Sequence, residues 1–229
     1  IAGRDKLYSV IAHDLRSPMG SIKMVLNMLM LNLPVEKIGG EMYELLTMAN
    51  RTTEDVFSLL DNLLKWTKSQ IGNLNVVYQD VDAVEVVDSV IDVFNMVAGL
   101  KKITIREEKP EKLPVCTDID MLKTIIRNLL SNAIKFSNEN SEVLVKMEEQ
   151  GDTVVVSVKD SGCGIDEEGQ QKLLHTDTHF STFGTNNEEG SGLGLLLCQD
   201  FAVKIGGKLW FTSKEGEGST FYFSIPLKK

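Results

Sequence analysis

The stretch "RNLLSNAIKFS", Arg127 to Ser137, carries the pattern that decides the fold of the second half of the chain. Asn128 and Asn132 lie four residues apart and Lys135 follows three residues later, so all three share one helix face. The other face is apolar: Leu129, Leu130, Ala133 and Ile134. Two amides and a cation suit a Mg²⁺ ion that keeps several waters and bridges phosphates. A solvated polar face is the alternative, and this segment alone does not separate the two.

Three glycine-rich turns follow this helix. "DSGCGI" (160–165) ends a predicted strand with two closely spaced glycines, which lets a planar ligand approach the backbone, and Asp160 could accept a hydrogen bond from an exocyclic amine. "GSGLGLLL" (190–197) runs into an apolar helix whose first N–H groups form an anion site, and "GEGST" (216–220) opens a strand. Each turn alone is weak evidence, but three of them after the Asn/Asn/Lys helix form a much stronger pattern together.

Short β-branched or alternating runs around these turns predict strands: "NVVYQ" (75–79), "ITIRE" (103–107), "EVLVKMEEQ" (142–150), "TVVVSVKD" (153–160), "KLWFTS" (208–213) and "STFYFSIPL" (219–227). Helical windows lie between them, at 83–97, 118–136, 167–174 and 192–205. Turns at Gly151-Asp152 and at "EGEG" (215–218) join strands into antiparallel hairpins. We therefore expect residues 73–229 to form an α+β two-layer sandwich, a mixed sheet with helices on one face.

Residues 1–72 have a different sequence pattern, one that is typical of helices. Apolar residues recur at three- and four-residue steps from Leu7 to Leu29, and heptad-like spacing runs from Met42 to Trp66 beyond a proline- and glycine-containing turn at 32–40. Two such helices form a hairpin that covers its own apolar seams poorly, so we expect a homodimer with a four-helix bundle. A monomeric hairpin folded back on the next domain is the alternative.

The first helix contains the segment "SVIAHDLRSPMG", Ser9 to Gly20. At about 100° per residue, His13 points about 180° away from the apolar seam, so we expect it to face water. Asp14 is adjacent, Ser17 lies one turn further on the same face, and Pro18 removes the N–H that would bond the carbonyl of Asp14. An ordinary surface histidine is the alternative reading.

Composition excludes several classes of protein. The 229 residues carry a formal net charge of -9, which argues against nucleic acid as a partner. Three cysteines without close pairing suit reduced thiols, and no apolar run reaches the length of a membrane span. The chain starts at Ile1, so we expect an excised piece whose membrane or targeting segments lie upstream.

Other nucleotide and metal motifs are missing from the sequence. It contains neither the Gly-x-x-x-x-Gly-Lys-Ser/Thr phosphate loop nor a strand-first Gly-x-Gly-x-x-Gly, which argues against P-loop and dinucleotide-binding folds. His175 and His179 have helical spacing, but no third metal ligand is obvious nearby.

Nearly the whole chain resembles the transmitter core of two-component sensor histidine kinases. "SVIAHDLRSPM" is similar to the phosphoacceptor box of that family, "RNLLSNAIKFS" to its asparagine box, "DSGCGI" and "GSGLGL" to its glycine boxes, and "GEGSTFYFSIP" to its closing turn. The resemblance implies a dimerisation and phosphotransfer hairpin (1–72) followed by a Bergerat-type ATP-binding domain (73–229). It implies a response-regulator receiver domain as the partner. It also implies that this chain is the cytoplasmic portion of a bacterial inner-membrane sensor protein.

The resemblance also implies a role for each matching residue. His13 takes the γ-phosphoryl group of ATP with Asp14 as its base or orienting carboxylate, and Asn132 holds Mg²⁺ with help from Asn128. The remaining positions surround the nucleotide: Lys135 at a phosphate, Phe136 against the nucleotide, Asp160 at the adenine amine, Gly162 and Gly164 beside the base, Gly190, Gly192 and Gly194 at the phosphate lid and helix start, and Ser219 and Thr220 near the base end.

Two departures from the family pattern leave alternatives open. Many relatives carry Thr or Asn where this chain has Ser17, which puts phosphatase activity in doubt, and no Lys or Arg occurs from Leu173 to Val203. Lys135, Arg127, Arg16 or a protonated His179 would then replace the usual lid cation. A signalling scaffold without phosphoryl transfer and a gyrase-like ATPase are the competing functions, although no acid stands at Asn128 to activate water.

Overall fold

The computed structural model describes residues 2–33, 39–70, 74–173, 185 and 193–227, with the side chains of 2–14, 51, 55, 68 and 70 left out. The chain divides into two compact units, Ile1–Asn75 and Val76–Lys229. The division lies close to the boundary that the change of sequence pattern suggests. No described helix is long and apolar enough to cross a membrane.

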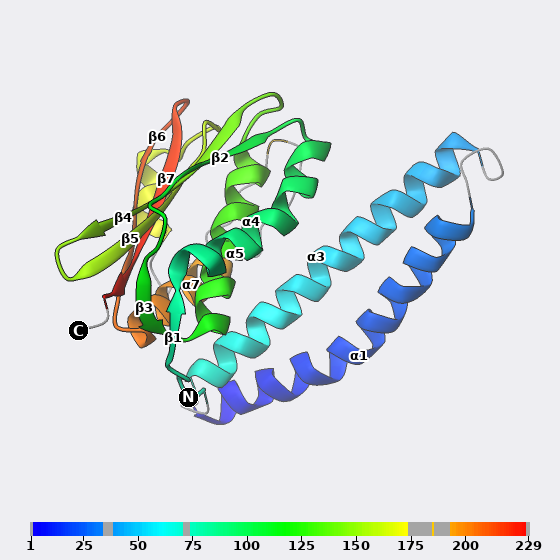
Figure 1. Cartoon of the computed structure of the whole chain (residues 1–229). Helices are drawn as coiled ribbons and strands as arrows, with labels where there is room; N and C mark the ends of the chain where they lie inside the picture. The colour runs from blue at the N-terminus through cyan, green and yellow to red at the C-terminus, as the bar shows by residue number, and fades with distance from the viewer. Residues whose placement is uncertain (1, 34–38, 71–73, 174–184, 186–192, 228–229) are drawn as a thin grey trace. The chain divides into compact units, whose positions relative to one another are not determined.

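The first unit is an antiparallel helical hairpin (Figure 1). It consists of α1 (Ala2–Asn32), which continues through Pro18, and α3 (Gly40–Gln70). Met19 of α1 packs against Leu60 and Leu64 of α3, which are both buried. Ion pairs flank this contact and join Arg16 to Asp61 and, at 3.3 Å, Lys23 to Glu54.

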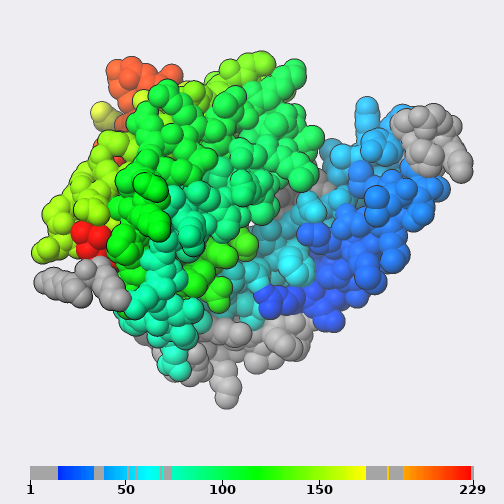
Figure 2. Space-filling model, in the orientation of Figure 1, coloured from blue at the N-terminus to red at the C-terminus, as the bar shows by residue number. Residues whose placement is uncertain are grey.

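The second unit is built on a mixed five-stranded sheet of order β2-β4-β5-β7-β6. Its strands are β2 (Thr104–Glu108), β4 (Glu142–Gln150), β5 (Thr153–Lys159), β6 (Leu209–Lys214) and β7 (Gly218–Pro226). β2 pairs with β4 in parallel and the other neighbours are antiparallel, as the two predicted hairpins require. Gly151 supplies a φ of +63° in the β4–β5 turn, which projects at the left of Figure 2.

Helices cover one face of this sheet (Figure 1). They are α4 (Ala83–Leu100), α5 (Ile119–Phe136) and α7 (Leu193–Lys204), while the short α6 (Glu167–Lys172) follows β5. Alternate strand residues face the helices and are buried, among them Val143 and Val145 of β4 and Val156 and Val158 of β5. The α+β architecture with helices on one face is therefore confirmed.

The strand prediction was wrong at residues 75–78. β1 spans only Gln79–Asp82 and pairs with β3 (Pro114–Thr117), a strand that the sequence pattern missed. The amide of Val77 donates 2.8 Å to the carboxylate of Asp118 instead of to a strand neighbour, and Val77 and Tyr78 are exposed. Apolar composition alone suggested a strand there, whereas a side chain distant in sequence takes the backbone hydrogen bond.

Candidate nucleotide site

Asp160, directly after β5, is the central acid of the candidate site. Its side chain is 4% exposed, and its Oδ1 accepts hydrogen bonds from the backbone N of Gly162 (2.9 Å) and of Ser219 (3.1 Å). Burial raises the pKa of Asp160, and the two backbone donors oppose that shift without cancelling it. A buried carboxylate held in one orientation can accept a hydrogen bond from a ligand with high selectivity.

Backbone segments approach one another around Asp160 so closely that glycine is required. A Cβ on Gly162 would lie 2.1 Å from the carbonyl oxygen of Phe136, at the end of α5. Gly164 has a φ of +66°, and a Cβ there would lie 2.0 Å from the carbonyl oxygen of Lys214, at the end of β6. The structure therefore gives these glycines a packing role against protein backbone, and the approach of a planar ligand to the loop stays a prediction.

Hydroxyl groups bind the glycine loop to the β6–β7 hairpin. Ser219 Oγ lies 2.8 Å from Ser213 Oγ, and Ser213 Oγ accepts the amide of Ile165 at 2.9 Å. Ser219 is 7% exposed and faces the helices. Thr220, which we expected near the base end, lies on the opposite face of β7 from Ser219, because successive strand residues point to opposite sides.

The polar face of α5 runs up to this loop. Asn128, Asn132 and Lys135 are all half-buried on the predicted helix, whose other face fills the core. Asn128 Nδ2 donates 2.9 Å to the carbonyl of Thr124, and a Cβ on Gly194 would lie 2.6 Å from Asn128 Oδ1. The first turn of α7 therefore lies against Asn128, so the structure brings the asparagine motif and the second glycine motif together.

The candidate cations differ in surroundings. Lys135 Nζ lies 5.2 Å from the centre of the Phe136 ring, which places both at the end of α5 beside Gly162. Arg127 is exposed, whereas Arg16 forms an ion pair with Asp61 inside the hairpin. Lys135 and Arg127 both lie on α5 of the second unit, and Arg16 lies on α1 of the first. Gly190, Gly192 and His179 lie outside the described residues.

The phosphoacceptor motif lies on α1. The helix includes His13 and Asp14, whose side chains lie outside the described part, so the predicted exposure of His13 stays a prediction. Ser17, one turn later, is exposed, and its carbonyl accepts a hydrogen bond from Ser21 Oγ at 3.2 Å.

Some residues of the site region gave no usable local signal. Ser213 and Lys101 have ordinary sequence surroundings, and only the fold brings Ser213 to Ser219 and Lys101 to the end of α5. Their partners lie between 6 and 84 residues away along the chain. Contacts of this kind follow from tertiary packing and not from local spacing.

Comparison with known proteins identifies the family of the chain. Residues 117–229 match the family model of the histidine kinase-, DNA gyrase B- and HSP90-like ATPases. The adaptive-response sensory kinase SasA of Crocosphaera subtropica is 29% identical over 229 residues, covering 98% of this chain and 59% of SasA. The chain thus spans less than two thirds of that relative.

Solved structures give the same result. The catalytic domain of the histidine kinase ThkA is 31% identical, with a TM-score of 0.58, and the match covers 66% of this chain and 96% of that domain. Full-length ShkA in complex with AMPPNP matches 98% of this chain and 46% of its own length with a TM-score of 0.73, at 21% identity, which shows the shared fold. The chain belongs to the sensor histidine kinases of two-component systems, and its second unit contains their HSP90-like ATPase domain.

Proposed function

We propose that the chain is a protein histidine kinase that binds ATP in residues 73–229, transfers its γ-phosphoryl group to His13 in residues 1–72, and passes the group to an aspartate of a response-regulator receiver domain. The observation that carries this proposal is the buried carboxylate of Asp160, held at a point where three backbone segments meet. The same chain supplies a helical hairpin with a histidine for the transfer.

Adenine recognition rests on Asp160 and the loop that follows it. The carboxylate can accept a hydrogen bond from the exocyclic amine. Gly162 and Gly164 let the loop pack against the carbonyl groups of Phe136 and Lys214, which holds the loop beside the carboxylate. Ser219 fixes the carboxylate through its amide, while Phe136 supplies an aromatic surface at the end of α5.

The donor set on α5 fits a hydrated magnesium ion. Asn132 and Asn128 offer neutral amide oxygens and Lys135 offers positive charge, which suits an ion that keeps waters and binds mainly through phosphates. No cluster of three or more His, Cys, Asp or Glu side chains occurs in the described residues, so we place the metal with the nucleotide. When bound, Mg²⁺ would neutralise charge on the phosphates.

The transfer needs positioning more than covalent apparatus. A neutral imidazole nitrogen of His13 attacks the γ-phosphorus, the bond to the β–γ bridging oxygen breaks, and ADP leaves. Asp14 accepts the proton from the ring, which leaves a labile phosphoramidate. A receiver carboxylate then attacks the phosphorus, the P–N bond breaks, and the imidazole regains a proton. Because ATP and receiver domains are cytoplasmic, we assign this portion of the protein to the cytoplasm.

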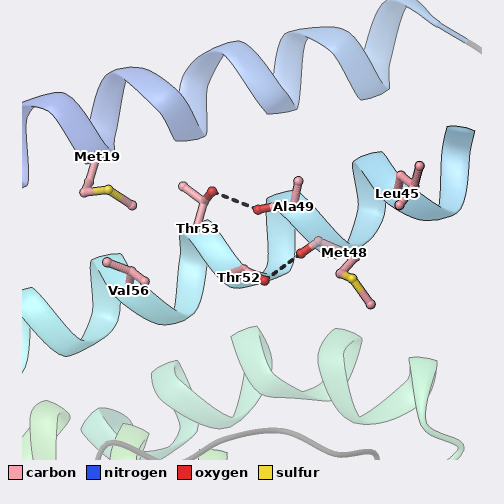
Figure 3. A pocket seen from close by; sticks show the side chains of 7 residues that line it. All are labelled: Met19, Leu45, Met48, Ala49, Thr52, Thr53 and Val56. Carbon is pink, nitrogen blue, oxygen red and sulfur yellow. Dashed lines mark hydrogen bonds between the residues drawn. The ribbon is translucent and has the colours of Figure 1, made fainter.

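The hairpin surface supports a homodimer. Leu15, Ile22, Val25 and Leu29 follow heptad spacing on α1, and their side chains are 37–52% exposed. On α3, the side chains of Met42, Leu45, Val56 and Leu59 are 36–56% exposed. An apolar hollow of about 470 Å³ lies on this hairpin, lined by Met19, Leu45, Met48, Ala49, Thr52, Thr53 and Val56 (Figure 3). A second copy would cover these seams as a four-helix bundle.

Labelling with γ-labelled ATP tests the central proposal. We expect acid-labile, alkali-stable label that is lost in His13→Gln and retained in the matched control His175→Gln. Nucleotide binding without label would support a scaffold instead, and phosphate release that survives His13→Gln would support an ATPase.

The metal assignment has its own matched pair of variants. Asn132→Ala should weaken Mg²⁺-ATP binding by about tenfold, whereas Asn138→Ala, an exposed asparagine beyond the helix, should leave the Kd unchanged. Equal affinities in a calorimetric titration of the two variants would exclude Asn132 as the ligand.

The dimer is tested by placing a charge on the seam. Ile22→Asp, in the heptad pattern, should convert the dimer to a monomer in light scattering, because the charge would be buried without a partner. Leu31 is 84% exposed and lies off the seam, so Leu31→Asp should remain a dimer. A monomeric wild-type chain would overturn the assignment.

A further inference from the structure

The C-terminal ends of α4 and α5 are joined by a buried lysine. Lys101, the C-cap of α4, is 8% exposed. Its Nζ donates hydrogen bonds to the carbonyl oxygens of Ile134 (3.0 Å) and Lys135 (2.8 Å) and to Thr185 Oγ1 (2.6 Å). An ammonium group is costly to bury, and these acceptors offset that cost.

Backbone geometry fixes the direction of this lysine. Lys102 adopts a φ of +56°, and the amides of Lys102 and Ile103 return to the carbonyls of Gly99 and Ala98, at 3.0 and 2.9 Å. The chain therefore reverses at the end of α4 with Lys101 held inside the turn. At the far end of its side chain lie the last carbonyls of α5, which lack helical N–H partners and carry the negative end of the helix dipole.

Thr185 is also bound at the C-terminal end of α5. Its Oγ1 lies 2.8 Å from the carbonyl oxygen of Ser137, and its amide donates 3.3 Å to the carbonyl of Lys135. In the sequence, Thr185 lies between the two glycine boxes. Lys101 thus connects three points: the end of α4, the end of the helix that carries Asn132 and Lys135, and Thr185.

We infer that Lys101 is a positioning residue for the nucleotide, which holds the end of α5 and Thr185 in the arrangement that binds the phosphates. This inference rests on the proposed function. Lys101 acts through the carbonyls of Ile134 and Lys135 and not by contact with the nucleotide. Phe136, the next residue, borders Gly162 of the base loop, so a shift at the end of α5 would reach both ends of the ligand.

Two neighbouring lysines give a matched comparison. Lys101→Met removes the buried ammonium, while Lys102→Met removes an exposed one whose Nζ lies 3.6 Å from a carboxylate oxygen of Glu139. Hydrogen exchange without nucleotide should show faster exchange at the Thr185 amide in Lys101→Met and no change in Lys102→Met. The Kd for Mg²⁺-ATP should rise at least tenfold in Lys101→Met only.

Variants at Thr185 keep the test decisive if Lys101→Met fails to fold. Thr185→Val removes the hydroxyl from an exposed residue without burying a charge, and Thr185→Ser restores it. We expect Thr185→Val to raise the Kd with no change in Tm, and Thr185→Ser to return it to the wild-type value. A general loss of stability would not produce this rescue.

The outcomes separate the two proposals. Wild-type exchange at Thr185 and wild-type Kd in both Lys101→Met and Thr185→Val would overturn the inference while the kinase proposal stands. A wild-type chain that binds no nucleotide would overturn the proposed function, and with it the positioning role.

Discussion

The contact between Gly162 and the end of α5 can be tested by adding one methyl group. In Gly162→Ala, the new Cβ would lie 2.1 Å from the carbonyl oxygen of Phe136 and 2.7 Å from its carbonyl carbon. Backbone atoms on both sides must separate by about 1 Å to reach normal contact, since the obstacle is a carbonyl and not a flexible side chain. The amide of Gly162 would then leave Asp160 Oδ1, which now accepts it at 2.9 Å.

The expected size of the effect follows from this displacement. Overpacking a tight site costs about 1–3 kcal/mol of folding free energy, which lowers Tm by about 2–4 °C for each kcal/mol in a domain of this size. Misplacing a binding group by about 1 Å can cost on the order of 100-fold. We therefore expect a folded variant with a Tm several degrees lower and a Kd for Mg²⁺-ATP raised 10- to 100-fold.

Gly99→Ala is the matched control, because it adds the same methyl group in the last turn of α4, where a Cβ would meet nothing within 4 Å. Alanine is favoured over glycine in a helix by about 0.5–1 kcal/mol, so Tm should stay or rise slightly and the Kd should not change. Calorimetric titration and thermal melting measure both quantities. A wild-type Kd and Tm in Gly162→Ala would refute the close approach of the loop to α5.

Three further predictions concern single side chains. Burial raises the pKa of Asp160 above its ordinary 3.8, so its stabilising contribution is present in full below that pH and is lost as the pH rises through the folded-state pKa. Asp160→Asn should therefore flatten the fall of Tm above pH 4 and abolish ATP binding; an unchanged profile of Tm against pH would contradict this. Asp82 Oδ1 accepts the amides of Val84 (3.0 Å) and Leu113 (2.9 Å), so Asp82→Ala should cost about 1–2 kcal/mol in chemical denaturation, and no loss would contradict the cap. Cys163 is exposed between the loop glycines, whereas burial raises the pKa of Cys198. Alkylation followed by mass spectrometry should therefore show Cys163 modified first, and Mg²⁺-ATP should slow the alkylation of Cys163. An alkylation rate that Mg²⁺-ATP does not change would place the nucleotide elsewhere.

Local pattern was sufficient for the long elements. The alternation in β4 and β5, with a glycine turn between them, predicts both strands and their antiparallel pairing, and the apolar face of α5 predicts its burial. The local pattern failed to predict β1 and β3, which have four residues each and are stabilised by pairing with one another. A strand of that length carries too few alternating positions to be recognised.

Within the candidate site, too, the local sequence predicts some contacts and not others. Asn128, Asn132 and Lys135 lie within one helix, so their shared face follows from sequence spacing alone. The bond from Ser219 to Asp160 spans 59 residues, and those from Lys101 span 33 to 84 residues. Such contacts depend on the order of strands in the sheet, which no local pattern contains.

The hairpin shows a further limit of periodicity. The contact between α1 and α3 uses Met19 and the ion pairs of Arg16 and Lys23, and it leaves Ile22 and Val25 of the apolar seam exposed. Periodicity shows that a face will be covered but not by which surface. A helix that turns one face to its hairpin neighbour and keeps a second, apolar face exposed presents the surface that a second hairpin would cover in the proposed four-helix bundle.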